Sequence, residues 1–426
     1  MNFLRYAALG LMPAVAGAML TLAGEPAAVP AKVEPELAPD KALLAKIEAL
    51  PDSTCMKLPP PKEAGDISWF GKPDWPNTEN MPKYGPGGRD YCDKMAWAPD
   101  RKRALFCGAN HQAPHYLNDV WEYDLAANTW VCLGVPDPQF TGTEEWFKNN
   151  AEFKDGVFQT KRGGPIRPCH TWSGLSYDSD KRKLYWLDPL RGLAFFGYHK
   201  EWSVGMHKML GVSEEDLKTK WKPGGQVNAW RNTYIWVFDP YARGWAVLTD
   251  NMPPVDEGSA TEYIPELKQL WVAPGGPYLY DPDKKAIKSL KANGPGPGGE
   301  LVTAYDPVDK VMVAVLGAKT HIYSFATNEW KLAQEKAMAN GSDSRSFFCY
   351  DLVAKRFVLY GSDPERKSVH LWLYDAKDNV WTEPERQGDF PAGGRPLGYY
   401  DPERNVTVLC GTGQNVYVYR GKRAAN

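Results

Sequence analysis

The amino-acid sequence predicts an all-β protein that folds as a six-bladed β-propeller. The prediction depends on three observations: many aromatic side chains, many turn-forming residues and a strand pattern that recurs along the chain. Of the 426 residues, 13% are aromatic, and 39 Gly and 36 Pro supply the turns that a strand-rich fold needs. The later copies of the strand pattern recur at the spacing that is typical of propeller blades.

The first recurring pattern is a strand, a tight turn and a second large apolar residue. In each copy an alternating apolar strand ends in an aromatic residue, and the large apolar residue follows seven positions later. Asp or Asn starts such turns by accepting hydrogen bonds from nearby backbone N–H groups. The copies begin and end at Tyr123 and Trp130, Phe238 and Trp245, Tyr280 and Ile287, Tyr323 and Trp330, and Tyr374 and Trp381.

A second hairpin pattern alternates with the first, so each unit has four strands. We name these strands a to d, from the innermost to the outermost, with a tight turn after strand a and another after strand c. The first two units are lengthened by insertions. The six turns that follow the strands a are marked by Asp100, Asp178, Ile264, Asp306, Asp351 and Asp401.

The second unit carries a family resemblance. Its segments "RPCHTWSGLSYD" and "TYIWVFDPYARGW" resemble the two halves of the Kelch repeat of β-propellers, and the resemblance extends over residues 55–422. The paired Gly of the repeat is complete only at Gly275 and Gly276. The resemblance implies a Kelch-type propeller of the exported bacterial type. The chain also has a distant resemblance to the central domain of galactose oxidase and to the propellers of periplasmic sialic acid epimerases.

The sixth unit ends after strand c and lacks an outer strand. Near the N-terminus, the segment "STCMKLPPP" repeats the order of "NTWVCLGVP", with Cys55 in the position of Trp130. We therefore expect residues 51–61 to supply strand d of the last blade. Closing the ring in this way removes the free strand edges that an open ring would expose.

The N-terminus predicts export. Arg5 is followed by an apolar run to about Ala23 and then by small residues that suit signal peptidase; an uncleaved membrane anchor is the alternative. We expect a signal peptide at residues 1–31, a linker and short helix at 32–50, and the propeller at 51–426. Its insertions, 134–168 and 188–232, are expected on one face. The mature chain is expected to be a periplasmic or secreted monomer without a membrane span.

Two groups of side chains are candidate ligand contacts. The first is the aromatic residues of the insertions, notably Trp146 and Trp202; the alternative is that these aromatics form a small core of their own. The second is a group of residues just before the strands a, which we expect to ring the mouth of the central channel and bind acidic groups. In the alternative, they join neighbouring blades. This second group comprises Arg89, Arg167, His170, Glu300, Arg345 and Arg395.

These features favour an exported binding module for a glycan or protein ligand, which uses the inserted face and the Arg-lined channel mouth. The alternative is a sugar-modifying enzyme, a mutarotase similar to sialic acid epimerases or, less closely, a copper radical oxidase. A third possibility is a structural platform in an envelope complex. The oxidase ligands, two Tyr, two His and a crosslinked Cys, cannot be assigned to residues here.

Several functions are excluded by composition and motifs. A formal net charge of -2, mixed in sign along the chain, argues against a nucleic-acid partner. No catalytic, metal-binding or cofactor motif is recognisable, so we expect no metal and no cofactor. The seven cysteines fit no metal spacing, and a disulfide between Cys92 and Cys169 is left open.

Overall fold

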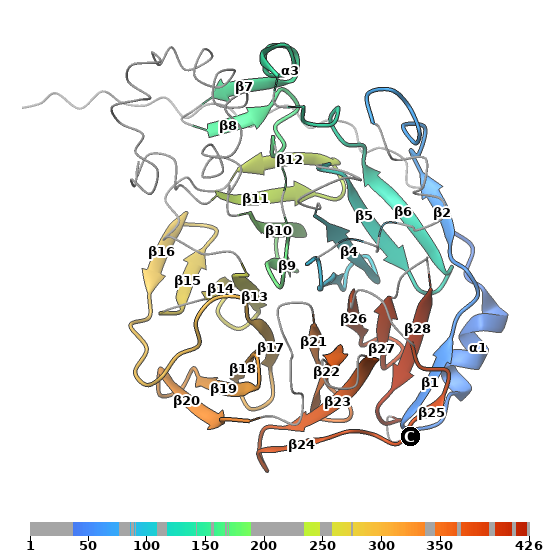
Figure 1. The fold of residues 1–426 in the computed structure, drawn as a ribbon, viewed down its shortest axis with the longest axis vertical. Coiled ribbons are helices and arrows are strands. Elements are labelled where there is room, and N and C mark those ends of the chain that lie inside the picture. The colour runs from blue at the N-terminus through green and yellow to red at the C-terminus, as the bar shows by residue number, and fades with distance from the viewer. Residues whose placement is uncertain are drawn as a thin grey trace, which may run out of the picture.

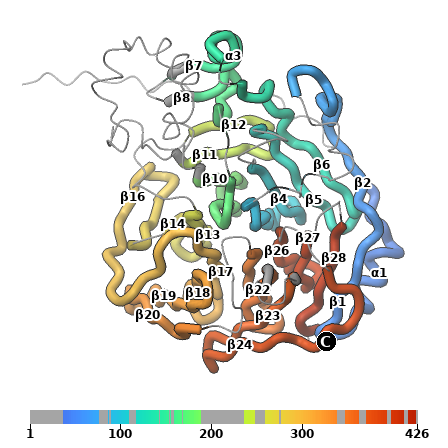
Figure 2. The backbone as a smooth tube through the Cα atoms, viewed as in Figure 1, coloured from blue at the N-terminus to red at the C-terminus, as the bar shows by residue number. Residues whose placement is uncertain are grey.

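The computed structural model has six blades arranged around a central axis (Figure 1). Each blade is an antiparallel sheet whose first strand lies nearest the axis and whose fourth strand lies at the outside, as the backbone trace in Figure 2 also shows. The six-bladed propeller predicted from the sequence is confirmed. The structure describes residues 37–75, 86, 89, 91–108, 117–141, 143–154, 157–166, 168, 170–188, 234–247, 258–273, 276–336, 346–363, 368–391, 397–410 and 415–423.

The first three blades follow one another along the chain. In each, the strands a to d pair with their neighbours in sequence order. Blade 1 comprises β3 (Ala96–Ala98), β4 (Arg103–Cys107), β5 (Val120–Asp124) and β6 (Thr129–Gly134). Blade 2 comprises β9 (Leu175–Asp178), β10 (Lys183–Asp188), β11 (Tyr234–Asp239) and β12 (Gly244–Val247). Blade 3 comprises β13 (Ala260–Ile264), β14 (Gln269–Ala273), β15 (Tyr278–Asp281) and β16 (Ala286–Ser289).

The last three blades repeat this arrangement. Blade 4 comprises β17 (Val302–Asp306), β18 (Val311–Leu316), β19 (Lys319–Ser324) and β20 (Glu329–Gln334). Blade 5 comprises β21 (Phe347–Asp351), β22 (Arg356–Asp363), β23 (Ser368–Asp375) and β24 (Val380–Thr382). Blade 6 comprises β26 (Leu397–Asp401), β27 (Val406–Cys410), β28 (Val416–Arg420) and β1 (Thr54–Lys57). Middle strands such as β5 and β27 are buried along their whole length, because neighbouring blades cover both faces.

The N-terminal strand closes the last blade, as the sequence predicts. β1 pairs antiparallel with β28, and Cys55 lies opposite Tyr419. Cys55 holds the position that Trp holds in other blades, and it is 1% exposed. Burial raises the pKa of its thiol to about 12. The thiol is therefore a packed part of the core and is not a reactive group at neutral pH.

Two short parallel strands extend the outer edges of blades 1 and 6. β2 (Lys62–Gly65) pairs with β6, and β25 (Gln387–Gly388) pairs with β1. Each ends in a glycine at positive φ, 86° for Gly65 and 84° for Gly388. A Cβ at either glycine would overlap a carbonyl oxygen of the paired strand, so only glycine allows this close approach. These additional strands were not predicted from the sequence.

A repeated asparagine contact joins neighbouring blades. In the c–d turns of blades 1, 4 and 5, an Asn with positive φ accepts a hydrogen bond from the Tyr hydroxyl five residues earlier. Its side-chain N–H then donates to a backbone carbonyl of the preceding blade or its connection. These donor–acceptor pairs are Asn128 with Pro59, Asn328 with Leu290, and Asn379 with Ala333. Pro59 directly follows the closing strand, so the same contact that joins interior blades also closes the ring.

A short helix, α1 (Lys41–Ala49), precedes β1 and lies on the outside of the ring (Figure 1). Asp40 caps it by accepting a hydrogen bond from the backbone N–H of Leu43 at 2.9 Å. Leu43 and Ile47 are buried. Near the other end of the helix, the Arg420 guanidinium donates to the Ile47 carbonyl at 2.7 Å. Residues from both ends of the described chain therefore stabilise each other.

The first insertion forms a small unit at the outer edge of blade 2. It comprises α3 (Glu144–Asn150) and the hairpin of β7 (Ala151–Lys154) and β8 (Val157–Thr160), which lie beyond β12 in Figure 1. Trp146 is 6% exposed and packs edge-on against Phe140 and Phe147, with ring centroids 5.0 and 5.6 Å apart. These aromatics are continuous with the hydrophobic core of blades 1, 2 and 6.

Several predictions concern residues outside the described ranges. They include the signal peptide at 1–31, Cys169, and residues 189–233 with most of the second insertion. In the described part of the chain, no helix combines the length and the apolar character that crossing a membrane requires.

Candidate functional site

The central channel contains a cavity of about 330 Å³ that all six blades line. Its walls are the six strands a, and the lining reaches the turns after these strands through residues such as Pro99 and Leu352. Because the strands a share one direction along the axis, these turns lie at one end of the channel. The cavity therefore occupies this end of the channel. The charged ring predicted from the sequence belongs to the other end, at the d-to-a connections.

Six aromatic side chains, one from each blade, line the cavity near these turns. Each stands immediately before the residue that pairs across the a–b turn, as Tyr305 stands before Asp306. The repeat therefore brings all six to the same level of the channel. We name this set the aromatic collar: Trp97, Tyr177, Tyr263, Tyr305, Tyr350 and Tyr400.

The tyrosines of the collar reach across to carboxylates of the preceding blade. The Tyr263 hydroxyl donates to Asp180 Oδ2 at 2.6 Å, and the Tyr305 hydroxyl donates to Glu266 Oε2 at 3.3 Å. Burial and then the carboxylate of the preceding blade raise the pKa of the other three hydroxyls. These pairs are Tyr177 with Asp100, Tyr350 with Asp306, and Tyr400 with Asp351.

Ring stacking closes the sixth junction, between blades 6 and 1. The Trp97 ring lies at 12° to the Tyr399 ring, with centroids 5.7 Å apart. Contacts between neighbouring blades thus continue around the whole channel. Because these contacts fix side chains of the collar before a ligand arrives, a ligand has little ordering of them to do when it binds.

An ion pair forms the polar part of the cavity wall. Lys94 Nζ lies 2.6 Å from Glu262 Oε1 and donates to the Thr261 carbonyl at 3.0 Å. The Thr303 hydroxyl also donates to Glu262 Oε1, at 3.2 Å. Burial raises the pKa of Glu262, and the Lys94 charge opposes this shift. Both described contacts of this carboxylate use Oε1, and Glu262 is part of the cavity lining.

Cys349 lines the cavity close to this ion pair. Its Sγ lies 3.9 Å from the Thr407 hydroxyl. Burial, followed by the charge of Asp351, raises the pKa of the thiol far above its ordinary value. The thiolate, which is the nucleophilic form of cysteine, is therefore scarce at neutral pH, and the side chain acts as a small apolar wall.

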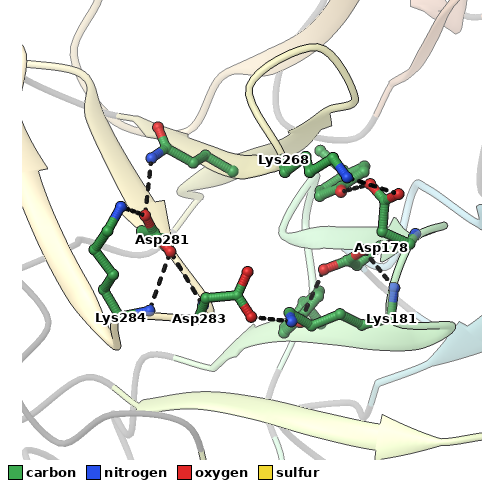
Figure 3. Close-up of polar contacts among 10 residues, drawn as sticks. Asp178, Lys181, Lys268, Asp281, Asp283 and Lys284 are labelled. Carbon is green, nitrogen blue, oxygen red and sulfur yellow. Dashed lines mark hydrogen bonds and ion pairs between the residues drawn. The ribbon is translucent and has the colours of Figure 1, made fainter.

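Ion pairs connect the turns around the cavity, as Figure 3 shows for blades 2 and 3. Lys181 pairs with Asp283 of the next blade, and Lys268 Nζ lies 3.6 Å from Asp180 Oδ1. Asp178 Oδ1 accepts hydrogen bonds from the backbone N–H groups of Asp180 and Lys181, both at 2.9 Å. Exposed pairs contribute roughly 0–1 kcal/mol each, so their main effect is to position the turns.

Two predicted site residues are buried in local contacts. The Arg89 guanidinium is 2% exposed, lies 2.5 Å from Asp119 and sits over the ring of Phe106 at 5.2 Å. His170 is also buried, and its ring lies 4.5 Å from that of Tyr91. Arg89 joins parts of blade 1, because Asp119 and Phe106 belong to that blade. The described contacts of both side chains are therefore structural.

The remaining predicted site residues are placed differently. Glu300 is exposed just before β17, and Trp146 is buried in the hydrophobic core that the first insertion shares with blades 1, 2 and 6. The charged ring at the channel mouth stays a prediction, because Arg167, Arg345 and Arg395 lie outside the described residues, as does Trp202.

The cavity residues were not predicted from the sequence. The collar has a readable signal, because an aromatic residue stands at the same place in all six repeats. Lys94 and Glu262 have no such signal, since they are far apart in the chain and only the closed ring brings them together.

The cavity offers few ligands for a metal ion. Within the ranges that the structure describes, no three His, Cys, Asp or Glu side chains group closely enough to hold one. Near the ion pair, the cavity presents the Glu262 carboxylate, already paired with Lys94, and a protonated thiol. These groups suit hydrogen bonding to an organic ligand.

Comparisons with known proteins leave the family open. No protein-family model and no curated protein matches this sequence. Among solved structures, a chain in "Crystal structure of Nidogen/Laminin Complex" is similar at 10% identity and a TM-score of 0.39, over 70% of this chain and 82% of that chain. A similarity at this level has no bearing on the ligand.

Proposed function

We propose that this protein is an exported binding module that holds a small ligand in the central cavity. The observation that supports the proposal is a cavity of about 330 Å³ lined by the aromatic collar and by Lys94 and Glu262. Ligand pockets typically measure roughly 300–1,000 Å³ and are mostly apolar, with a few well-placed polar groups. The cavity has this size and this composition.

The shape and chemistry of the cavity limit the size and the chemical class of ligand that can bind. The collar suits a compact group that packs against aromatic rings, and the Glu262 carboxylate suits a hydrogen-bond donor. A single sugar unit has these properties, and so does a side chain presented by a protein partner. The ligand classes predicted from the sequence, glycan and protein, are therefore both compatible with this site.

We place the ligand in the cavity and not on the inserted face. Arg89, His170 and Trp146 are buried among protein partners, so they offer little surface to a ligand. The other predicted cations, such as Arg167, are expected from the sequence at the opposite mouth of the same channel, where a longer ligand would meet them. The Kelch-type repeat and the export signal remain part of this proposal.

A second candidate function is mutarotation of an acidic sugar, which one observation favours. Glu262 has a raised pKa and lies within hydrogen-bonding distance of Lys94 inside a cavity. Opening and closing a sugar ring requires a group that donates a proton to the ring oxygen and takes it back. Sialic acid anomers should then equilibrate faster with the protein, followed by NMR, and Glu262→Gln should abolish the effect. If the anomers equilibrated at the same rate with the protein as in buffer alone, the mutarotase hypothesis would be rejected.

The binding function can be tested at the mouth of the cavity. Leu352 lines it and is 40% exposed, so Leu352→Trp narrows the entrance without disturbing the core. Val308, 55% exposed in the neighbouring blade, is outside the lining and provides the control Val308→Trp. In a ligand screen by NMR, compounds that bind the wild type should bind Leu352→Trp weakly and Val308→Trp normally. Equal binding to both variants would place the ligand elsewhere.

A further inference from the structure

We infer that the ligand of the central cavity carries an organic cation, such as an alkylated ammonium group, seated among the collar rings. The inference rests on the proposed function, because it names the chemical class of ligand for the same cavity. It is supported by the carboxylates that lie behind the tyrosines of the collar.

Aromatic rings attract cations to their faces because of the ring quadrupole. A tyrosine hydroxyl that donates a hydrogen bond to a carboxylate polarises its ring toward higher electron density, which strengthens this attraction. Tyr263 and Tyr305 donate in this way to Asp180 and Glu266. Nearby carboxylates of the preceding blade also raise the pKa of Tyr177, Tyr350 and Tyr400, although the Tyr400 hydroxyl donates to Asn405 Oδ1 at 2.8 Å. The hydrogen bonds that polarise the collar rings are therefore those of Tyr263 and Tyr305.

The charges around the collar also favour a cation. Asp306 Oδ1 accepts hydrogen bonds from the backbone N–H groups of Val308 and Asp309, at 2.8 and 3.2 Å. Neither Asp306 nor Glu266 pairs with a basic side chain within the described residues. Asp180 and Asp100 contribute less negative charge, because Lys268 Nζ lies 3.6 Å from Asp180 and Arg182 Nε lies 3.8 Å from Asp100. Lys94 is a cation in the lining, and Glu262 neutralises it at 2.6 Å.

An anionic ligand suits this environment poorly. It would approach Asp306 and Glu266 across the thin layer of collar rings, and the ammonium of Lys94 is already paired. A neutral ligand would gain contact with the rings but no attraction from the charges behind them. The described residues therefore favour a positive ligand over both alternatives.

Choline and 3,3-dimethylbutan-1-ol test this inference, because they share one shape and differ in the charge of the central atom. Titration calorimetry with the full chain should show choline binding about tenfold more tightly than the neutral alcohol. Tyr305→Phe keeps the ring and removes its hydrogen bond to Glu266, so it should weaken choline binding and leave the alcohol unaffected. Tyr323→Phe is the control in the same blade, since its hydroxyl donates to Asn328 outside the cavity lining.

The possible outcomes separate the ligand class from the binding function. Equal affinities for the two probes, or unchanged choline binding in Tyr305→Phe, would refute the inference that the ligand is cationic. The cavity would still be a binding site. The same conclusion would follow if neither probe bound while a neutral fragment did. If no fragment of any charge bound at the collar, the proposed function would fail as well.

Discussion

Asn128 holds the closing strand in place, and its replacement tests the ring closure quantitatively. Its Nδ2 donates to the Pro59 carbonyl at 2.9 Å, and its Oδ1 accepts from the Tyr123 hydroxyl at 2.6 Å. The residue has a φ of 47°, a conformation that Asn and Asp adopt more readily than most residues. Asn128→Asp therefore keeps the backbone and the acceptor, and it replaces the donor to Pro59 by a carboxylate oxygen that faces the Pro59 carbonyl.

The two contacts allow the expected losses to be estimated separately. Losing the hydrogen bond to Pro59 and placing a buried carboxylate against that carbonyl in Asn128→Asp should lower the free energy of unfolding by at least about 1–3 kcal/mol. Asn128→Ala also leaves the buried Tyr123 hydroxyl without its acceptor and puts alanine, which adopts the left-handed region less readily than Asn, at this positive φ. Its loss should be about 2–5 kcal/mol.

Urea unfolding followed by tryptophan fluorescence measures both losses. Asn379→Asp is the matched control, because Asn379 donates to the Ala333 carbonyl at 2.9 Å and accepts from Tyr374 at 2.7 Å inside the ring. The two Asp variants should lose similar stability. If Asn379→Asp were destabilised and Asn128→Asp were as stable as the wild type, the closing junction would not be formed as described.

Three further predictions concern close contacts and burial. Gly388→Ala should lower the unfolding free energy by at least about 1–2 kcal/mol, because its φ is 84° and a Cβ would overlap the paired strand; Gly244→Ala, where a Cβ meets nothing within 4 Å, should change the melting temperature little. Arg89→Met should cost about 3–5 kcal/mol by leaving the buried Asp119 unpaired, and a stable variant would contradict this. Burial raises the pKa of the Cys410 thiol to about 12, so a thiol reagent at pH 8 should label it only after unfolding, and rapid labelling of the native protein would refute the burial.

The repeat made much of the fold predictable. The turns at Asp178, Ile264, Asp306, Asp351 and Asp401 coincide with the ends of the inner strands. The similarity of residues 53–61 to an outer strand was sufficient to predict the closure, because a missing strand d left only one place for that segment. Local turn chemistry and a fixed strand period determine both features, and a single sequence displays both.

The cavity was less predictable because it depends on contacts between repeats. Every collar position is visible in the sequence, but the direction of the side chains toward the channel follows only from the closed ring. The ion pair of Lys94 and Glu262 joins blades 1 and 3, and no local pattern selects those two residues among many charged ones. β2 lacks an apolar alternation, so its pairing with β6 was equally hidden.

The most direct test of the proposed site is a crystallographic screen of small fragments that includes cationic, neutral and anionic compounds. Bound fragments are expected between the rings of the aromatic collar, with cationic compounds the most frequent. Fragments that bound on the inserted face or at the opposite channel mouth, and never within the collar, would contradict a ligand site in the central cavity.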